Sequence, residues 1–430
     1  MAGVLVAVGN RWDSPVATVL ESSRAVRIAR RCADLADLLA AVESGTGEVA
    51  LVSVDLRGLA LSVVARLRDA GVAVVGLFDP ADEDSERRLR QMGVSSVIPA
   101  DGDLTAYESA LLDPSAEPDS ELGLWTGGEP PESASRTEGG PPRRATLVAV
   151  WGPVGSPGRT TIAVNLAAEL AALGTSALLV DADTYGGCVA QTLAVLDEAP
   201  GLAAATRAAD HGTLDLASLA RLAPEVMPRL RVLTGIPRPE RWTEIRAGAL
   251  ERVLDLSRGL ADVVVVDCGF SLEDDEELSY DTEAPRRNQA TLTTLQVADA
   301  LVAVGGCDPV SLQRLVRGLQ DLGTVRAPRP SVVVNRVRPG AVGSPPQARV
   351  AEAMARFAGV EDLAFVPEDR GACDEALLTG RSLAECAPQS PCRLAIRALA
   401  TAVAGERADA ADQAAARSWG AVRWRPRLAR

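Results

Sequence analysis

The sequence contains no lysine, so all 44 of its basic residues are arginine. No mechanism that depends on a lysine of this chain can therefore operate, and arginine does not replace a lysine point charge conservatively. Histidine occurs once, at His211, which excludes a histidine-rich metal site. Aromatic residues make up only 3% of the chain, so few side chains are available to stack on nucleic-acid bases.

Basic charge is also in deficit, because 58 acidic residues against 44 arginines give a formal net charge of −14. A net acidic chain gains nothing from the release of phosphate counterions, and we expect no specific nucleic-acid partner. No apolar run approaches the roughly 18 residues that span a bilayer, and no N-terminal signal pattern is present. The seven cysteines are scattered and never spaced Cys-x-x-Cys, which is typical of free thiols. We expect a cytoplasmic protein.

What the chain does contain is enough apolar sequence for two or three domains, since 47% of its 430 residues are hydrophobic. Residues 1–112 alternate β-branched runs with amphipathic stretches, which predicts a five-stranded flavodoxin-like α/β domain. Residues 113–144 are rich in Pro, Gly and acid, and predict a disordered linker. Residues 145–405 predict a larger, mostly parallel sheet. Residues 406–430 predict a helix and a basic tail.

Apolar runs give the expected strands of both domains. In the first domain the strands are expected at residues 4–8, 26–29, 49–54, 72–77 and 95–98, with helices at 34–42 and 82–92. In the second domain they are expected at residues 146–151, 177–180, 231–233, 262–266, 300–304, 331–334 and 363–366.

A glycine-rich turn, Gly152-Pro-Val-Gly-Ser-Pro-Gly-Arg-Thr-Thr161, stands between the first strand of the second domain and a helical repeat of apolar residues. Strand, glycine-rich turn and helix together predict a phosphate-binding loop, because its backbone N–H groups and the helix dipole attract phosphate. A threonine hydroxyl at the helix start can reach Mg²⁺. The Rossmann pattern Gly-x-Gly-x-x-Gly fails, since Pro153 occupies its second glycine position.

Carboxylates follow two later strands of this domain: Asp181 and Asp183 after one, and Asp267 after another. Open α/β sheets bind ligands at the carboxyl ends of their strands, and a metal-bound phosphate needs oxygen ligands there. Taken alone, each aspartate could equally be an ordinary loop residue or helix cap instead of a site residue. Three of them in register with a phosphate loop favour a nucleotide site.

Two more segments complete a family resemblance: Val334-Asn335-Arg336 and Val366-Pro-Glu-Asp369, the latter followed by residues 377–383. Over roughly residues 145–405 the chain resembles the ParA/MinD family of deviant Walker-type ATPases. The resemblance implies an ATP and Mg²⁺ site, with nucleotide contacts from Gly155, Ser156, Pro157, Gly158, Arg159, Thr160, Thr161, Asn335, Arg336 and Pro367.

Individual roles are also implied by this resemblance. Thr160 would ligate Mg²⁺, Asp267 would support the metal through water, and Asp181 would assist it. Asp183 would position the attacking water, with Arg159 as the second catalytic residue. Asn335 would read adenine beside Pro367.

Two positions depart from the family pattern. The family has lysine where Arg159 stands, and a second, signature lysine that in this register falls at Val154. Arginine keeps the charge but is planar, bulkier and differently hydrated. The sequence therefore leaves open a slow ATPase, a non-hydrolysing nucleotide-binding scaffold, or a regulator controlled by phosphorylation of the first domain.

In the first domain, Asp55 follows a strand at the place where receiver domains carry their phospho-acceptor. The acidic pair and the lysine of a working receiver are replaced by Gly9-Asn10 and, approximately, Pro99-Ala100. The domain thus resembles a degenerate receiver that serves docking. A receiver-like domain ahead of a ParA/MinD-like ATPase resembles the CpaE-type pilus localisation ATPases and actinobacterial septum-site-determining proteins. This implies a homodimerising switch with protein partners in a pilus, secretion or division machinery.

Two further segments have a functional and a simpler interpretation. Residues 273–277 through 286–288 lie where related ATPases keep a switch loop, although a solvated acidic loop fits equally well. The tail from Trp419 to Arg430 carries four arginines and two tryptophans, which would suit peripheral contact with anionic lipid. Pro426 favours a disordered tail instead.

Overall fold

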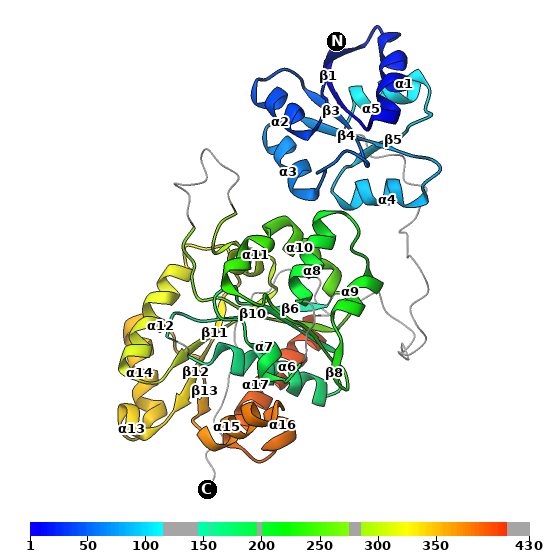
Figure 1. Ribbon diagram of the computed structural model, residues 1–430. Coiled ribbons are helices and arrows are strands. Elements are labelled where there is room, and N and C mark those ends of the chain that lie inside the picture. The colour runs from blue at the N-terminus through cyan, green and yellow to red at the C-terminus, as the bar shows by residue number, and fades with distance from the viewer. Residues whose placement is uncertain (115–144, 156, 196–199, 275–284, 411–430) are drawn as a thin grey trace. The chain divides into compact units, whose positions relative to one another are not determined.

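A computed structural model describes residues 1–114, 145–155, 157–195, 200–274 and 285–410. These residues form two compact units, each built on its own sheet (Figure 1). The predicted α/β class is confirmed for both sheets. Nearly all of the predicted linker and the basic tail lie outside the described residues.

The N-terminal unit has five parallel strands in the order β2-β1-β3-β4-β5, which is the flavodoxin-like order. Apolar side chains of α2, α3 and α4 form the core on one face of the sheet, and those of α1 and α5 form it on the other. The strands are β1 (Ala2–Ala7), β2 (Val26–Arg31), β3 (Val49–Ser53), β4 (Ala73–Phe78) and β5 (Ser96–Pro99). The helices are α1 (Asn10–Glu21), α2 (Leu35–Glu43), α3 (Leu61–Asp69), α4 (Glu83–Gln91) and α5 (Leu104–Leu112).

Aspartates fix the starts of three of these helices. The side chains of Asp34, Asp82 and Asp103 accept hydrogen bonds from backbone N–H groups in the first turns of α2, α4 and α5. Each bond satisfies a donor that a helix start leaves unpaired.

The C-terminal unit has eight strands in the order β13-β12-β11-β6-β10-β7-β9-β8. Among the described strands, only the edge pair β8 and β9 is antiparallel. The sequence did not predict β8, which has three residues. The strands are β6 (Thr146–Trp151), β7 (Ala177–Ala182), β8 (Glu225–Met227), β9 (Leu230–Leu233), β10 (Val263–Cys268), β11 (Ala300–Gly306), β12 (Pro330–Val337) and β13 (Leu363–Pro367).

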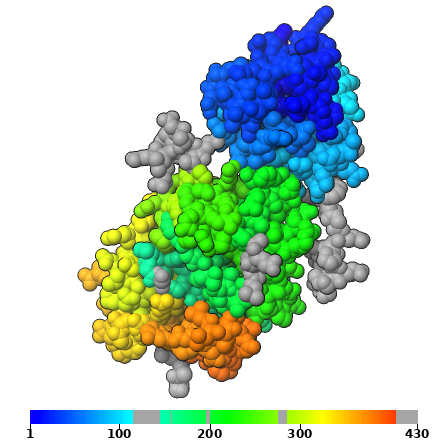
Figure 2. Space-filling model, viewed as in Figure 1, coloured from blue at the N-terminus to red at the C-terminus, as the bar shows by residue number. Residues whose placement is uncertain are grey.

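Helices cover both faces of this larger sheet (Figure 1). Its last helix, α17, continues across the predicted domain boundary at residue 405. Helices α15 and α16 lie in the region that is coloured orange in Figure 2. No helix in the described ranges is both long and apolar enough to cross a membrane. The helices are α6 (Arg159–Ala172), α7 (Val189–Thr192), α8 (Gly201–Asp210), α9 (Leu216–Leu222), η1 (Pro239–Glu244), α10 (Ala247–Ser257), α11 (Gln289–Val297), α12 (Pro309–Leu322), α13 (Pro339–Val342), α14 (Pro346–Ala358), α15 (Arg370–Thr379), α16 (Leu383–Cys386) and α17 (Pro391–Ala410).

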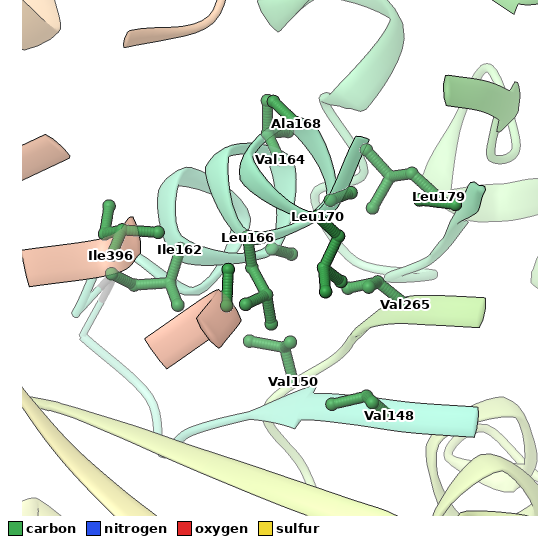
Figure 3. Packing of buried hydrophobic residues seen from close by; sticks show 14 of the residues in the cluster. Val148, Val150, Ile162, Val164, Leu166, Ala168, Leu170, Leu179, Val265 and Ile396 are labelled. Atoms are coloured by element: carbon green, nitrogen blue, oxygen red, sulfur yellow. The ribbon is translucent and has the colours of Figure 1, made fainter. Parts of the chain in front are cut away.

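Helix α6 is buried on all sides, and it directly follows the predicted phosphate loop. Ile162, Leu166 and Leu170 face the strands, while Ile396 of α17 packs beside Ile162 (Figure 3). All of the buried residues of α6 except Asn165 and Glu169 are apolar, so packing on every side fixes the position of the helix. The first turns of α6 therefore present the loop from a rigid support.

Two polar links tie α6 to the helices after β13. Asn165 donates through Nδ2 to Thr161 O (2.8 Å) and accepts through Oδ1 from Leu383 N (2.8 Å). Glu169, which is 1% exposed, accepts from Arg393 Nε at 2.6 Å and Nη2 at 3.2 Å. Such a bidentate pair adds directional specificity to the helix contact.

Candidate functional site

The predicted site residues meet because three strands end at one edge of the larger sheet. Strand β10 lies between β6 and β7, and the register places Asp267 beside Val150 on one side and beside Asp181 on the other. On the far side of β6, Asn335 of β12 pairs with Gly306 of β11. The phosphate loop, the aspartates and the asparagine thus reach the same edge, where parallel sheets bind ligands.

The phosphate loop turns through glycines with positive φ, +113° at Gly155 and +97° at Gly158. A Cβ on Gly158 would collide with the side-chain amide of Asn335, so this position needs glycine for close approach as well as for its backbone angle. The Asn335 amide donates to Pro157 O (2.9 Å) and so holds the loop. Ser156 lies outside the described residues.

The Arg159 guanidinium lies folded against the loop that carries it. Nη1 donates to Gly152 O (3.1 Å) and Pro153 O (3.2 Å), and Nη2 donates to Asp183 Oδ2 (3.2 Å). The pair is largely buried, with 11% of the Arg159 side chain and 5% of the Asp183 side chain exposed. The two residues predicted to be catalytic are therefore bound to each other.

Thr160 and Asp267 form the second contact across the site. Thr160 Oγ1 donates to Asp267 Oδ2 at 2.6 Å, while Asp267 Oδ1 is buried with no partner among the described residues. Burial raises the pKa of Asp267 well above its usual range, and the nearby charge of Asp181 raises it further. Burial likewise raises the pKa of Asp181 to about 7.

These oxygen atoms fit a divalent cation. An orphaned carboxylate oxygen beside a helix-start hydroxyl is the kind of donor that Mg²⁺ accepts, and a cation would favour the charged carboxylates that burial disfavours. The described residues contain no cluster of three or more His, Cys, Asp or Glu side chains that could hold a metal by itself. Phosphate and water oxygens would have to complete the coordination.

The loop after β7 is tied to the end of the predicted switch segment. Asp183 Oδ1 accepts from Tyr185 N (2.9 Å), and Tyr185 OH donates to Asn288 Oδ1 (2.7 Å). The Arg287 guanidinium lies 3.7 Å from the Tyr185 ring centroid and donates to Thr184 Oγ1 (2.9 Å). Residues 275–284 of this segment lie outside the described ones. This contact was not predicted from the sequence. The basic pair at residues 286–287 is the one sequence feature that pointed to it.

Arg336 and Pro367 stand at the ends of β12 and β13. Arg336 has a φ of +56°, and its carbonyl accepts from Cys307 Sγ (2.8 Å). Pro367 pairs with Val337 across the two strands, close in sequence to Asn335. The structure thus brings Asn335 and Pro367, the residues predicted to lie at the adenine, to neighbouring strand ends, while the base contact itself stays a prediction.

In the N-terminal unit, Asp55 lies in the turn after β3. Its Oδ1 accepts from Ser53 Oγ (2.5 Å) and its Oδ2 pairs with Arg11 Nε (3.2 Å). Arg11 also pairs with Asp79 (Nη1 to Oδ2, 2.9 Å), so one guanidinium lies between two carboxylates. Sequence reasoning missed Arg11, which directly follows the Gly9-Asn10 pair. Phosphorylation of Asp55 stays untested.

Comparison with known families gives one match over the larger domain. Residues 148–378 match the model described as the CobQ/CobB/MinD/ParA nucleotide binding domain. This range contains the phosphate loop, all three aspartates, Asn335 and Pro367. A comparison with curated protein sequences gives no match.

Solved structures with a similar fold include three that we report here. A ParA family ATPase from Chlorobium tepidum TLS is 20% identical, with a TM-score of 0.50 over 60% of this chain and 99% of that one. The septum site-determining protein MinD of Pyrococcus horikoshii OT3, complexed with Mg-ADP, is 20% identical, with a TM-score of 0.49 over 61% and 98% of the two chains. The MinC:MinD complex of Aquifex aeolicus gives 17% identity and a TM-score of 0.48 over 64% and 100%. At 20% identity, the similarity to the ParA family ATPase shows a shared fold alone.

Proposed function

Because the chain belongs to the CobQ/CobB/MinD/ParA nucleotide-binding family, we propose that it is an ATP-binding molecular switch of the ParA/MinD type. The observation that carries this proposal is the Thr160–Asp267 contact beside the glycine-rich loop, with Asp267 Oδ1 next to it and without a hydrogen-bond partner in the described part of the chain. Backbone N–H groups of the loop and the positive end of α6 would bind the phosphates. Thr160 and Asp267 would hold Mg²⁺, which neutralises phosphate charge when bound.

The second half of the proposal is that hydrolysis is slow. Asp183, the residue proposed to position the attacking water, already accepts a hydrogen bond from Arg159 through Oδ2. The Oδ1 oxygen already accepts from Tyr185 N and Gly186 N. These three hydrogen bonds compete with water for the lone pairs of Asp183. The Arg159 guanidinium is also held at Asp183, and it would have to leave that partner to contact a phosphate.

A non-hydrolysing scaffold is the alternative, and a specific observation favours it. Val154 stands at the position of the signature lysine and is 51% exposed, so no cation projects from it. The missing cation at Val154 and the Arg159–Asp183 pair together favour a site that binds nucleotide without hydrolysing it. The receiver-like N-terminal unit would then contribute through docking.

In the cell we propose that the switch takes part in spatial positioning, of pili or secretion systems, of a septum site, or of chromosomes. Nucleotide-dependent homodimerisation and binding to a protein of such a machinery would connect the site to its output. The arginine-rich tail would add peripheral contact with anionic lipid.

Arginine 159 provides the direct test of the nucleotide site. Thermal melts with Mg²⁺ and ATP, ADP or no nucleotide should show stabilisation, by about 2.7 kcal/mol when ligand is at 100 times its dissociation constant. Arg159→Ala should abolish the shift, because it removes the only cation that the loop itself carries. Arg221→Ala, at an exposed position of α9, is the matched control and should retain it.

Phosphate release in the same samples separates the two candidates. A thermal shift with phosphate release supports the switch, and a shift without release supports the scaffold. Faster release by Arg159→Lys would show that the natural site is tuned for slow turnover. An unchanged shift in Arg159→Ala would contradict the assignment of Arg159 to phosphate.

A further inference from the structure

Helix α12 approaches the phosphate loop closely. The helix begins after Asp308, whose side chain accepts from Ser311 N (3.1 Å), and it follows β11, the neighbour of β6. At Gly318 a Cβ would stand 3.0 Å from the Trp151 ring and 3.1 Å from Pro153 Cβ. A side chain at this position would force its neighbours to shift, so the helix backbone itself lies close to the start of the loop.

One helical turn before Gly318, Arg314 lies on the same side of α12. Its guanidinium lies against Gly155, with Cζ 3.3 Å from the point where a Cβ on that glycine would stand. The glycine has a φ of +113°, and its missing side chain leaves the space that the guanidinium enters. A residue distant in sequence thereby adds a cation to the loop.

Arg314 differs from Arg159 in its partners. Arg159 is bound to two carbonyls and to Asp183, whereas Arg314 forms no hydrogen bond or ion pair with any residue in the described ranges. It also lines an open cavity of about 760 Å³ that begins at Pro153 and Val154. The guanidinium is therefore exposed to solvent beside the loop, with its donors available to an anion.

We propose that Arg314 is a phosphate-contacting residue that gives the site its preference for a nucleoside triphosphate over a diphosphate. This inference rests on the proposed function. The cation would come from α12 and would lie at Gly155, near the start of the loop. Arg159 and Thr160 lie at the other end of the loop, where α6 begins. A triphosphate is longer and more charged than a diphosphate, so it would place more negative charge beside Arg314. A planar guanidinium can bind two phosphate oxygens at once.

Binding measured without turnover tests this role. Dissociation constants for ADP and for a non-hydrolysable ATP analogue, both with Mg²⁺, are measured by titration calorimetry on the full chain. Arg314→Ala should weaken the triphosphate analogue about tenfold, which is about 1.4 kcal/mol, and change the affinity for ADP far less. Arg314→Lys keeps the charge and should retain part of the preference.

Arg317→Ala is the matched control. Arg317 is also exposed on α12 and lines the same cavity, but it stands three residues further along the helix, so its removal changes net charge without changing the contact with Gly155. It should keep the wild-type ratio of the two affinities. Melting of each variant without nucleotide verifies the fold, and Arg314→Gln replaces the alanine variant if that one melts early.

The outcomes separate this inference from the proposed function. If the wild-type chain binds both nucleotides and Arg314→Ala keeps the wild-type preference, the role of Arg314 is wrong and the nucleotide site stands. An equal loss in Arg317→Ala would also overturn it, because the effect would then be general surface charge. If the wild-type chain binds neither nucleotide, the proposed function and this inference fail together.

Discussion

Replacing Asp181 by asparagine should stabilise the nucleotide-free chain at pH 8. Asp181 is 2% exposed, and its oxygens accept from Asp183 N (3.2 Å) and Val189 N (3.1 Å). Burial raises the pKa of this carboxyl from 3.8 to about 7, and the charge of Asp183 adds to the rise. The two backbone hydrogen bonds lower the pKa, but they are outweighed.

The sign of the pH effect follows from this direction. Since the folded pKa is raised, the fold favours the protonated carboxyl, and its contribution is present below pH 3.8 and lost as pH rises through about 7. A rise of this size corresponds to about 4 kcal/mol, of which about 2–3 kcal/mol falls between pH 5 and pH 8.

Asparagine removes the buried charge and keeps the shape. Its NH₂ group faces one of the two backbone N–H donors, and that mismatch costs about 1–3 kcal/mol. Against about 4 kcal/mol of avoided charge burial, the net gain at pH 8 is about 1–3 kcal/mol. At pH 4, where wild-type Asp181 is protonated when folded, the same variant should be less stable than wild type.

Urea unfolding at pH 4, 5, 6, 7 and 8, without Mg²⁺ or nucleotide, measures both effects. The difference between variant and wild type is the quantity to follow, because the N-terminal unit contributes equally to both chains. Asp321→Asn, at an exposed position of α12, is the control and should track wild type. A wild-type stability that does not fall between pH 5 and pH 8, with a parallel curve for Asp181→Asn, would refute the reasoning.

Two further substitutions test the support of the site. Gly158→Ala should lower the free energy of unfolding by about 1–3 kcal/mol more than Gly174→Ala in thermal melts. Both glycines have a φ above +90°, but a Cβ on Gly158 would meet the Asn335 amide, whereas one on Gly174 would face open space. Equal losses would show that Asn335 does not constrain the loop. Glu169→Gln should cost about 3 kcal/mol, because Arg393 keeps its buried charge without a charged partner, whereas Asp84→Asn, which breaks an exposed ion pair, should cost less than about 1 kcal/mol.

Much of the fold could be predicted from the sequence, because its strands are continuous β-branched runs. The first strand of the larger domain was placed at residues 146–151, as observed. The five strands of the N-terminal unit were placed within about two residues at each end, which is the ordinary uncertainty of such boundaries. Strand β8 was missed, since Glu225–Met227 is short and its edge pairing with β9 leaves no apolar run. Helices α1, α3 and α5 were also not predicted, and Pro15 within α1 is a helix-breaking signal.

The sequence by itself determined the chemistry of the candidate site. The spacing of the loop, and aspartates placed directly after buried strands, are local patterns whose geometry follows from short chain segments. Only the tertiary structure decided how these groups are paired: Arg159 with Asp183, Asn335 with Pro157, and Arg314 beside Gly155. Each of these contacts joins segments that are distant in the chain or separated by a turn. Their geometry depends on strand order, register and the packing of α6 and α12, which no local pattern specifies.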